Sequence, residues 1–315
     1  MKRNKKLISG PGVRYYDHRV GIVNARRPLA VRIFLPLFVT MGLLVGGSYF
    51  GYSQFMETRP VLANTSTVEA APNPEFSESS APDLKTHQAK EDEMLTKEIK
   101  DVLKDMPKNT EWAVSVRDLN YGRMANINAD KKLEAASFYK MYLLAPLEKK
   151  LYADYWKSYV GKQSINDCVK AMIKSSDNDC PQALGNYIRW DNIDSHNKTL
   201  GFTNTTVNTK DGMRTTSKEM SELMYRLQNS MMLSDKARRL VFDALYEQEL
   251  RQGIPKGCGQ DCLVANKTGE INDIKNDAAI VTHGDSKYVL VIMSKGASWD
   301  DVADLTTKID KIMRP

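Results

Sequence analysis

The sequence predicts a three-layer α/β fold, in which helices flank one antiparallel sheet beside a mostly helical lobe. Two observations predict this arrangement. Strand patterns occur near both ends of segment 91–315, and the residues between them favour helices. We therefore expect both ends of the segment to contribute strands to one sheet. A segment of this length forms one sizeable domain or two lobes that share a cleft.

The first predicted elements of this segment are a helix and a strand. Apolar residues recur at helical spacing from Met94 to Met106. Trp112, Val114 and Val116 then occupy every second position, which is the period of a strand. The order helix then strand is therefore expected at the start of the domain.

Strands and a helix are also predicted at the end of the chain. Residues 276–281 and 288–293 are predicted strands, the first ending in, and the second consisting mostly of, apolar residues, and 263–265 is a shorter predicted strand. From Trp299 to Ile312 the apolar residues return to helical spacing, and Ser298 before them is a favourable N-cap. These elements supply the other half of the expected sheet and a final covering helix.

A first polar motif, Ser137-Phe138-Tyr139-Lys140, begins an apolar run that predicts a buried helix starting at the serine. Residues three apart share a helix face, so Lys140 is expected close enough to Ser137 to accept its proton. A serine in this place, taken alone, is more often an N-cap. Two further motifs favour a catalytic role instead.

The second motif, Ser176-Asp177-Asn178, lies between the predicted helices 165–173 and 181–188. It is expected to form a polar turn at their junction. The third, Lys267-Thr268-Gly269, follows the strand 263–265. A cation and a hydroxyl beside a glycine at a strand end make an edge suited to a carboxylate.

These three motifs, in this order, resemble those of class A β-lactamases and their relatives among penicillin-binding proteins. The resemblance extends over residues 95–315 and implies a β-lactamase/transpeptidase-like fold. It implies that Ser137 is the nucleophile and that Lys140 is its activating base or proton relay. It further implies that Ser176 passes a proton toward the leaving nitrogen.

The resemblance also implies which residues bind the substrate. Asn178 would hold the substrate amide, and Lys267-Thr268-Gly269 would bind its carboxylate. The oxyanion hole is expected from the backbone N–H of Ser137 and from a backbone N–H near Ile271. No cofactor is implied.

One part of the class A pattern is missing. Class A enzymes carry a Glu, on a loop after the Ser-Asp-Asn turn, that activates the water for deacylation. Here no Glu occurs between Glu148 and Glu219. The acids between the Ser-Asp-Asn motif and Thr216 are Asp179, Asp191, Asp194 and Asp211. We therefore expect acylation followed by slow deacylation, with Asp191 and Asp194 as the first candidates for a replacement base.

The N-terminal part of the chain predicts a membrane anchor. Residues 33–52 contain no charged side chain, which is enough to span a bilayer as a helix, and we assign the signal-anchor helix to 33–55. The preceding residues 1–32 hold nine Lys and Arg against one acid, so this tail is expected in the cytoplasm and the catalytic domain on the extracytoplasmic side of the membrane. A cleaved signal peptide ending near Ala63 is the alternative.

The residues after this anchor predict a tether. Segment 56–90 is rich in Pro, Ser, Thr and Ala and poor in large apolar residues, which is typical of a flexible linker. The basic tail contributes +8 to a net charge of +6, so the remainder of the chain carries −2. No basic surface for nucleic acid is therefore expected.

The chain has four cysteines, an even number that is expected to pair in an exported domain. Of the three possible pairings, we favour Cys168–Cys180 with Cys258–Cys262, although sequence alone does not decide it. Zinc binding is the alternative, but no histidine lies at ligand spacing, so no metal is expected.

Three functions agree with these motifs. The first is an anchored serine hydrolase that opens β-lactam rings. The second is a D-alanyl-D-alanine peptidase that acts on peptidoglycan stem peptides, which share the acyl and carboxylate pattern of a β-lactam. The third is a non-catalytic peptidoglycan-binding or sensor domain, which the intact motifs disfavour. We expect the first.

Overall fold

Five antiparallel strands form the central sheet, in the order β2-β1-β9-β8-β7. The computed structural model describes residues 81–151, 158–208 and 212–314. Both ends of this part contribute strands, so the predicted sheet is confirmed. The strands are β1 (Glu111–Asp118), β2 (Met124–Ile127), β7 (Cys262–Ile271), β8 (Ile274–His283) and β9 (Ser286–Lys295).

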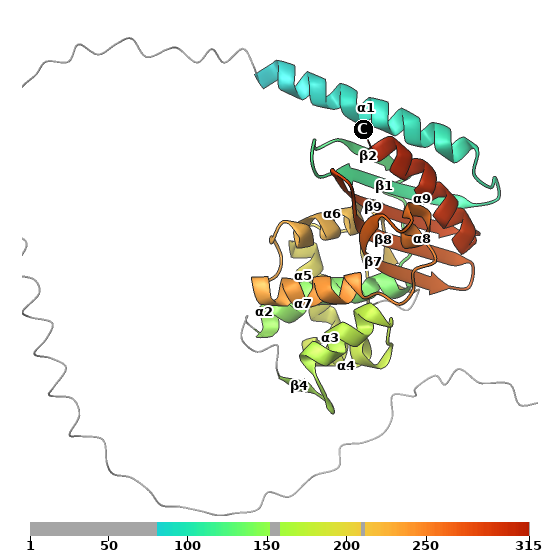
Figure 1. Cartoon of the computed structure of the whole chain (residues 1–315). Helices are drawn as coiled ribbons and strands as arrows, with labels where there is room; N and C mark the ends of the chain where they lie inside the picture. The colour runs from blue at the N-terminus through green and yellow to red at the C-terminus, as the bar shows by residue number, and fades with distance from the viewer. Residues whose placement is uncertain (1–80, 152–157, 209–211, 315) are drawn as a thin grey trace, which may run out of the picture. The chain divides into compact units, whose positions relative to one another are not determined.

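Three helices cover one face of the sheet (Figure 1): α1 (Ala81–Lys104), α8 (Ile254–Cys258) and α9 (Trp299–Met313). A capping box of Ser298 and Asp301 begins α9. Helix α1 extends into segment 56–90, where the sequence predicts only a linker, so that boundary is wrong. Its first turns are polar, and the helix is anchored further along by the buried side chains of Leu95 and Ile99.

The helical lobe packs on the opposite face. Its first member is a 3₁₀ helix, η2 (Ala136–Leu143), which continues into α2 (Leu144–Leu151). The other helices are α3 (Ile165–Lys174), α4 (Asp179–Ile188), α5 (Trp190–Thr199), α6 (Ser217–Gln228) and α7 (Asp235–Tyr246). Two short ladders join β3 (Leu133–Glu134) to β6 (Arg214–Thr215) and β4 (Tyr159–Val160) to β5 (Gln163–Ser164).

The sheet is buried on both faces, which gives the domain two hydrophobic cores. Along β8, Ala278 and Ile280 face the helical lobe, whereas Ala279 and Val281 face α8 and α9. Successive side chains of a strand point to opposite faces, so one apolar run serves both cores. The predicted three-layer arrangement is confirmed.

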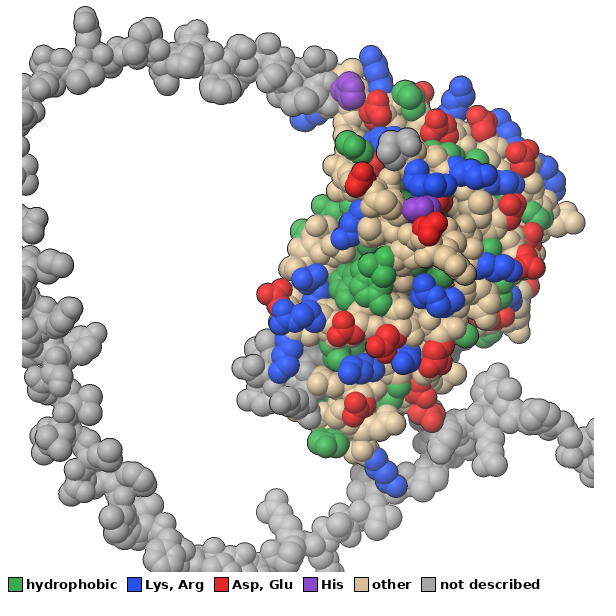
Figure 2. All heavy atoms as spheres, in the orientation of Figure 1, with side chains coloured by type: hydrophobic (Ala, Val, Ile, Leu, Met, Phe, Trp, Pro, Cys, Tyr) green, Lys and Arg blue, Asp and Glu red, His purple; other side chains and the backbone are tan. Residues whose placement is uncertain are grey.

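The surface view in Figure 2 shows acidic and basic side chains interspersed over the face presented. In the part of the chain that the structure describes, no helix is long and apolar enough to cross a membrane. The predicted cytoplasmic tail 1–32, the anchor helix 33–55 and most of the linker lie outside the described residues.

Candidate active site

Ser137 is the second residue of η2, and the backbone before it is firmly held. Ala136 has a positive φ of 44°, which is unusual for a residue other than glycine. Asn276 on β8 donates its side-chain amide to Glu134 O at 2.9 Å, and Ala135 N donates to Met213 O at 2.8 Å. The sequence predicts a helix starting at the serine, and the structure has a tighter 3₁₀ helix that starts one residue earlier.

Gly269 explains how η2 comes to lie against β7. A Cβ atom at this position would lie 2.9 Å from the carbonyl oxygen of Ala135 and 3.3 Å from the backbone nitrogen of Phe138. A glycine is therefore needed for the serine helix to approach the strand. The sequence suggests that a glycine stands here to let a ligand approach the strand. In the structure the space beside Gly269 is filled by the protein's own backbone.

The Lys140 ammonium group donates to the Ser-Asp-Asn turn. Its Nζ lies 2.6 Å from Ser176 O, 3.2 Å from Ser176 Oγ and 2.9 Å from Asn178 Oδ1. The Ser137 hydroxyl makes no hydrogen bond with any described residue. The sequence predicts that Lys140 lies close enough to Ser137 to accept its proton, and in the structure acceptors of the turn occupy all three donors of its ammonium group.

The Ser-Asp-Asn motif forms the predicted turn between α3 and α4. Ser176 has a positive φ of 57°, and Asp177 Oδ1 accepts from Cys180 N at 2.8 Å, which fixes the start of α4. The turn therefore presents the Ser176 hydroxyl and the Asn178 amide to Lys140.

A second lysine reaches the same hydroxyl from the sheet. Lys267 on β7 is fully buried, and its Nζ donates to Ser176 Oγ at 3.0 Å and to Thr268 O at 2.7 Å. The Ser176 oxygen therefore lies between two lysine side chains that come from different parts of the fold.

Burial lowers the pKa values of both lysines. The pKa of Lys140 falls to about 8 because burial disfavours the ammonium form, against a smaller raising effect of the Asp177 charge. The pKa of Lys267 falls to about 7, first through burial and then through the nearby Lys140 charge, and the Asp277 carboxyl opposes this fall. A lysine with a pKa in this range is able to act as a base at neutral pH.

Asp277 is a buried acid behind the lysines. It lies opposite Thr268 in the β7–β8 ladder and accepts from Ile254 N at 2.8 Å and from Asn266 Nδ2 at 3.0 Å. Burial raises its pKa to about 7, although both hydrogen bonds and the Lys267 charge favour the carboxylate.

Thr268 is buried, and its hydroxyl has no hydrogen-bond partner within residues 81–151, 158–208 and 212–314. Side chains alternate along a strand, so Thr268 and Lys267 point to opposite faces of the sheet. Because β7 is an edge strand, both residues flank its open edge. A ligand along that edge would satisfy the hydroxyl.

The backbone register decides which N–H groups of β7 face its open edge, where the sequence predicts an oxyanion donor near Ile271. Ile271 lies directly opposite Ile274 across a two-residue turn, where the flanking pair exchanges its backbone hydrogen bonds. The N–H of Ile271 therefore points toward β8. By the same alternation, the N–H of Glu270 points outward along the open edge of β7.

Both candidate replacement bases hold neighbouring backbone or side-chain groups. Asp194 accepts from Val207 N at 2.8 Å and Asn208 N at 3.1 Å, and Asp191 accepts from Asn208 Nδ2 at 2.5 Å. Both acids lie on α5. Asp179 is the exposed first residue of α4, and Asp211 lies outside the described residues.

The four cysteines form two disulfides, Cys168–Cys180 and Cys258–Cys262. The favoured pairing is thereby confirmed. The second disulfide contacts His283 and Asp310, which the sequence does not single out. The register supplies the missing signal, because it places His283 opposite Cys262.

Comparison with known proteins agrees with this architecture. Residues 94–158 and 153–313 match the model of the β-lactamase enzyme family. No curated protein matches the chain. Among solved structures, PBP-A is 19% identical with a TM-score of 0.62, and the match covers 69% of this chain and 95% of PBP-A.

A class A β-lactamase from Bacteroides cellulosilyticus is 20% identical with a TM-score of 0.59, covering 71% of this chain and 96% of that enzyme. A β-lactamase from Chitinophaga pinensis is 15% identical with a TM-score of 0.59, and the match covers 70% of this chain and 99% of that enzyme. These similarities show a shared fold. The family match spans the sheet, the helical lobe and all three motifs, and the chain therefore belongs to the β-lactamase enzyme family.

Proposed function

We propose that the chain is a membrane-anchored serine hydrolase that forms an acyl-enzyme at Ser137 and hydrolyses β-lactams slowly. The observation that carries this proposal is the convergence of Lys140 and Lys267 on the Ser176 hydroxyl, at the site where η2 meets β7. The anchor is inferred from residues 33–52 and the basic tail before them.

Lys140 and Ser176 would move the protons of acylation. A neutral Lys140, consistent with its pKa of about 8, accepts the proton of Ser137 as the serine oxygen attacks the lactam carbonyl. Ser176 then donates its proton to the leaving nitrogen as the amide bond breaks. The hydrogen bond from Lys140 to Ser176 Oγ provides the route by which Ser176 regains a proton.

The edge of β7 would bind and polarise the substrate. Lys267 and Thr268 bind the substrate carboxylate, and a carboxylate beside Lys267 favours its ammonium form, which leaves Lys140 as the neutral amine. Asn178 binds the substrate amide. The backbone N–H groups of Ser137 and Glu270 form the oxyanion hole, so Glu270 takes the place expected for Ile271.

Slow deacylation follows from the lack of a suitable base. The carboxylates of Asp191 and Asp194 already accept hydrogen bonds from the segment at 207–208. Asp177 is likewise engaged with the start of α4. Without a positioned base to take a proton from water, the ester should outlive its formation.

Two solved structures that share the fold support the choice of ligand class. A PBP-A mutant was solved as its acyl-enzyme complex with penicillin G, with a TM-score of 0.61 and 19% identity to this chain. Another neighbour, L2, was solved in complex with relebactam, with a TM-score of 0.59 and 18% identity. A D-alanyl-D-alanine peptidase remains the second candidate, because a base-poor site also suits acyl transfer to an acceptor other than water.

The test is to incubate the full chain, purified in detergent, with penicillin and measure its intact mass. One covalent adduct per chain is expected, and Ser137→Ala should abolish it. Ser175→Ala is the matched control, because Ser175 is an exposed neighbour of the turn. An adduct that persists in the Ser137→Ala protein would overturn the assignment.

Kinetics then separate the two candidate functions. A chromogenic cephalosporin should give a burst of one product per chain followed by slow turnover. A peptide ending in D-Ala-D-Ala is tested in parallel. Release of D-alanine with faster turnover than the lactam would favour the peptidase, whereas steady lactam turnover at about 1–10³ s⁻¹ without a burst would show that another group supplies the base.

A further inference from the structure

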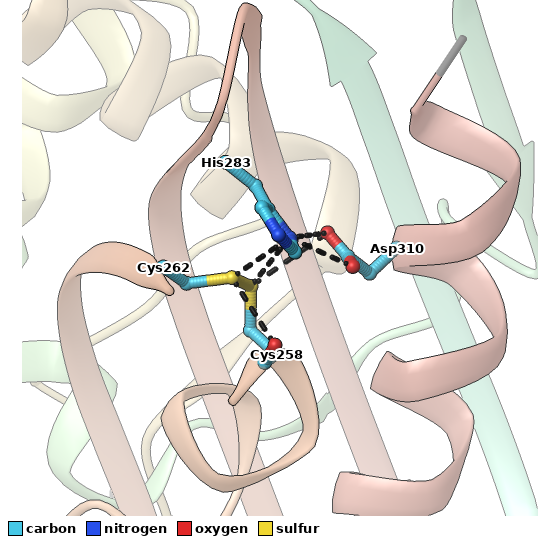
Figure 3. A group of neighbouring side chains, drawn as sticks. All are labelled: Cys258, Cys262, His283 and Asp310. Atoms are coloured by element: carbon cyan, nitrogen blue, oxygen red, sulfur yellow. Dashed lines mark hydrogen bonds and ion pairs between the residues drawn. A yellow bond between two sulfur atoms is a disulfide. The ribbon is translucent and has the colours of Figure 1, made fainter. Parts of the chain in front are cut away.

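Four metal-binding side chains from four elements meet on the sheet face that α8 and α9 cover (Figure 3). Cys258 ends α8, Cys262 begins β7, His283 ends β8 and Asp310 lies on α9. Their ligand atoms all lie within 4.8 Å of one another. Cys262 and His283 are direct partners in the β7–β8 ladder, so the fold brings together residues that the sequence separates.

The distances between these atoms are close to the edges of a tetrahedral metal site. His283 Nδ1 lies 3.1 Å from Cys262 Sγ, 3.9 Å from Cys258 Sγ and 3.0 Å from Asp310 Oδ2. Asp310 Oδ1 lies 3.6 Å from Cys258 Sγ. Around a tetrahedral Zn²⁺, neighbouring ligand atoms lie about 3.3–3.8 Å apart. The two sulfur atoms, which are bonded to each other, would have to separate, and His283 would move slightly away from Cys262 and Asp310.

The residue types and their spacing are those of a zinc site. Two cysteines separated by three residues fall within the spacing that structural zinc sites use, and imidazole and carboxylate are accepted further ligands. The site is also shielded, because the side chains of His283 and Asp310 are only 14% and 4% exposed.

Two residues outside this group of four, Tyr288 and Arg314, orient the Asp310 carboxylate. Tyr288 donates its hydroxyl to Asp310 Oδ1 at 2.8 Å, and Arg314 Nε lies 3.0 Å from Asp310 Oδ2. Such outer partners fix the orientation of metal-binding side chains in zinc proteins. Two thiolates, one carboxylate and Zn²⁺ carry a net charge of −1, which the Arg314 guanidinium neutralises.

We propose that these residues form a redox-gated site for a divalent cation of the zinc class. In the oxidised protein the Cys258–Cys262 disulfide closes the site. A thiol or phosphine reductant supplies two electrons and converts the disulfide to two thiols. Binding of Zn²⁺ then releases the two thiol protons, and the cation is held by both sulfurs, His283 Nδ1 and an Asp310 oxygen.

The Cys168–Cys180 disulfide is a natural control. Both of its sulfur atoms lie near the side-chain oxygen of Gln163, at 3.2 and 2.7 Å. An amide oxygen is a poor partner for zinc compared with imidazole, thiolate or carboxylate. Reduction should therefore create a metal site at one disulfide and not at the other.

The test is to measure Zn²⁺ binding by the full chain, purified in detergent, before and after reduction with a phosphine. About one Zn²⁺ per chain is expected after reduction and none before, read by competition with a chromogenic chelator. Co²⁺ in place of Zn²⁺ should give the absorption bands of a tetrahedral thiolate site. The Cys168→Ser/Cys180→Ser protein should behave like wild type, and the Cys258→Ser/Cys262→Ser protein should bind none.

Variants of the other two ligands and a labelling experiment complete the test. His283→Ala and Asp310→Asn should weaken binding by more than the roughly 10–100-fold typical of outer partners. In reduced wild type, Zn²⁺ should slow the alkylation of Cys258 and Cys262 and leave the slow alkylation of the buried Cys168 and Cys180 unchanged, which requires no variant to fold. Labelling of Cys258 and Cys262 that is the same with and without Zn²⁺ would show that Cys258–Cys262 is a structural disulfide only.

Discussion

Lys140 and Lys267 bind the same hydroxyl but are held in different ways. Lys140 donates only to the Ser-Asp-Asn turn, so its position is set by the packing of η2 against α3 and α4. Lys267 donates to Ser176 Oγ and to a carbonyl oxygen of its own strand, Thr268 O. The turn thus fixes Lys140 within the helical lobe, and Ser176 joins the lobe to the sheet.

These different contacts suit the two buried lysines to different roles. A side chain held by three acceptors of one turn suits proton transfer at a fixed point. A side chain at an open strand edge, bonded partly to its own strand, is able to exchange that carbonyl for a ligand carboxylate. We therefore expect Lys140 to act in the chemistry and Lys267 to act in recognition.

Removal of Lys140 should slow acylation of Ser137 more than removal of Lys267 does. Lys140→Ala should slow acylation of Ser137 by about 10²–10⁴-fold, because the site loses its general base. The measurement is the rate of penicillin adduct formation by intact mass. Lys149→Ala, an exposed lysine of α2, is the matched control and should acylate like wild type. Loss of less than about tenfold would move the role of base to another group.

Lys267→Ala should come next, and its effect should depend on the substrate. A charge-assisted hydrogen bond to a carboxylate is worth roughly 1.5–3 kcal/mol, or about 10–150-fold in acylation rate. A methyl ester of the same lactam lacks the charge and should lose much less. Equal losses for acid and ester would mean that Lys267 acts through the structure of the site.

Thr268→Val tests whether the unpaired hydroxyl serves the ligand. The substitution keeps the shape of the side chain, and we expect acylation by a charged lactam to fall by about tenfold, less than in Lys267→Ala. Because the hydroxyl has no partner among the described residues, the melting temperature should stay the same or rise. Unchanged acylation would exclude Thr268 from carboxylate binding.

Asp177→Asn should change acylation least of these variants. It should favour acylation at low pH, whereas the other substitutions slow it. The Asp177 charge raises the pKa of Lys140 against the effect of burial, so its removal should lower that pKa further. Neutral Lys140 then exists at lower pH, and the ascending limb of the acylation profile should move to lower pH. The Asn side chain still has an oxygen for Cys180 N. Asp179→Asn is the exposed control, and an upward shift of the limb would contradict this assignment.

Much of this domain was predictable because its apolar residues are periodic. The strands β8 and β9 and the helices α3 and α9 follow their sequence patterns closely. The start of α1 was not predictable in this way, because its first turns are polar. The 3₁₀ form of η2 also escapes periodicity, since it depends on the contact between Ala135 and Gly269 across the fold.

In the candidate site, too, some features follow from short sequence motifs and others depend on contacts across the fold. The Ser-Asp-Asn turn and the choice of Lys140 follow from short motifs. The proposed oxyanion donor depends on strand register, because the N–H of Glu270 faces the open edge of β7 and the N–H of Ile271 faces β8. The cluster around Cys262 depends on ladder pairing and on helix α9, so no sequence spacing could point to it.

The order of strands in the sheet also sets when the domain becomes complete during its synthesis. The ribosome makes β1 before the helical lobe and β9 after it, yet Val114 pairs directly with Ile292. Local contacts allow the helical lobe to form early, whereas pairing across such a separation is slow. Lys267 arrives at Ser176 only with the late strand β7. A nascent chain therefore carries Ser137 long before Lys267 reaches Ser176, and a truncation before β9 leaves β7 and β8 without the strand that joins them to β1.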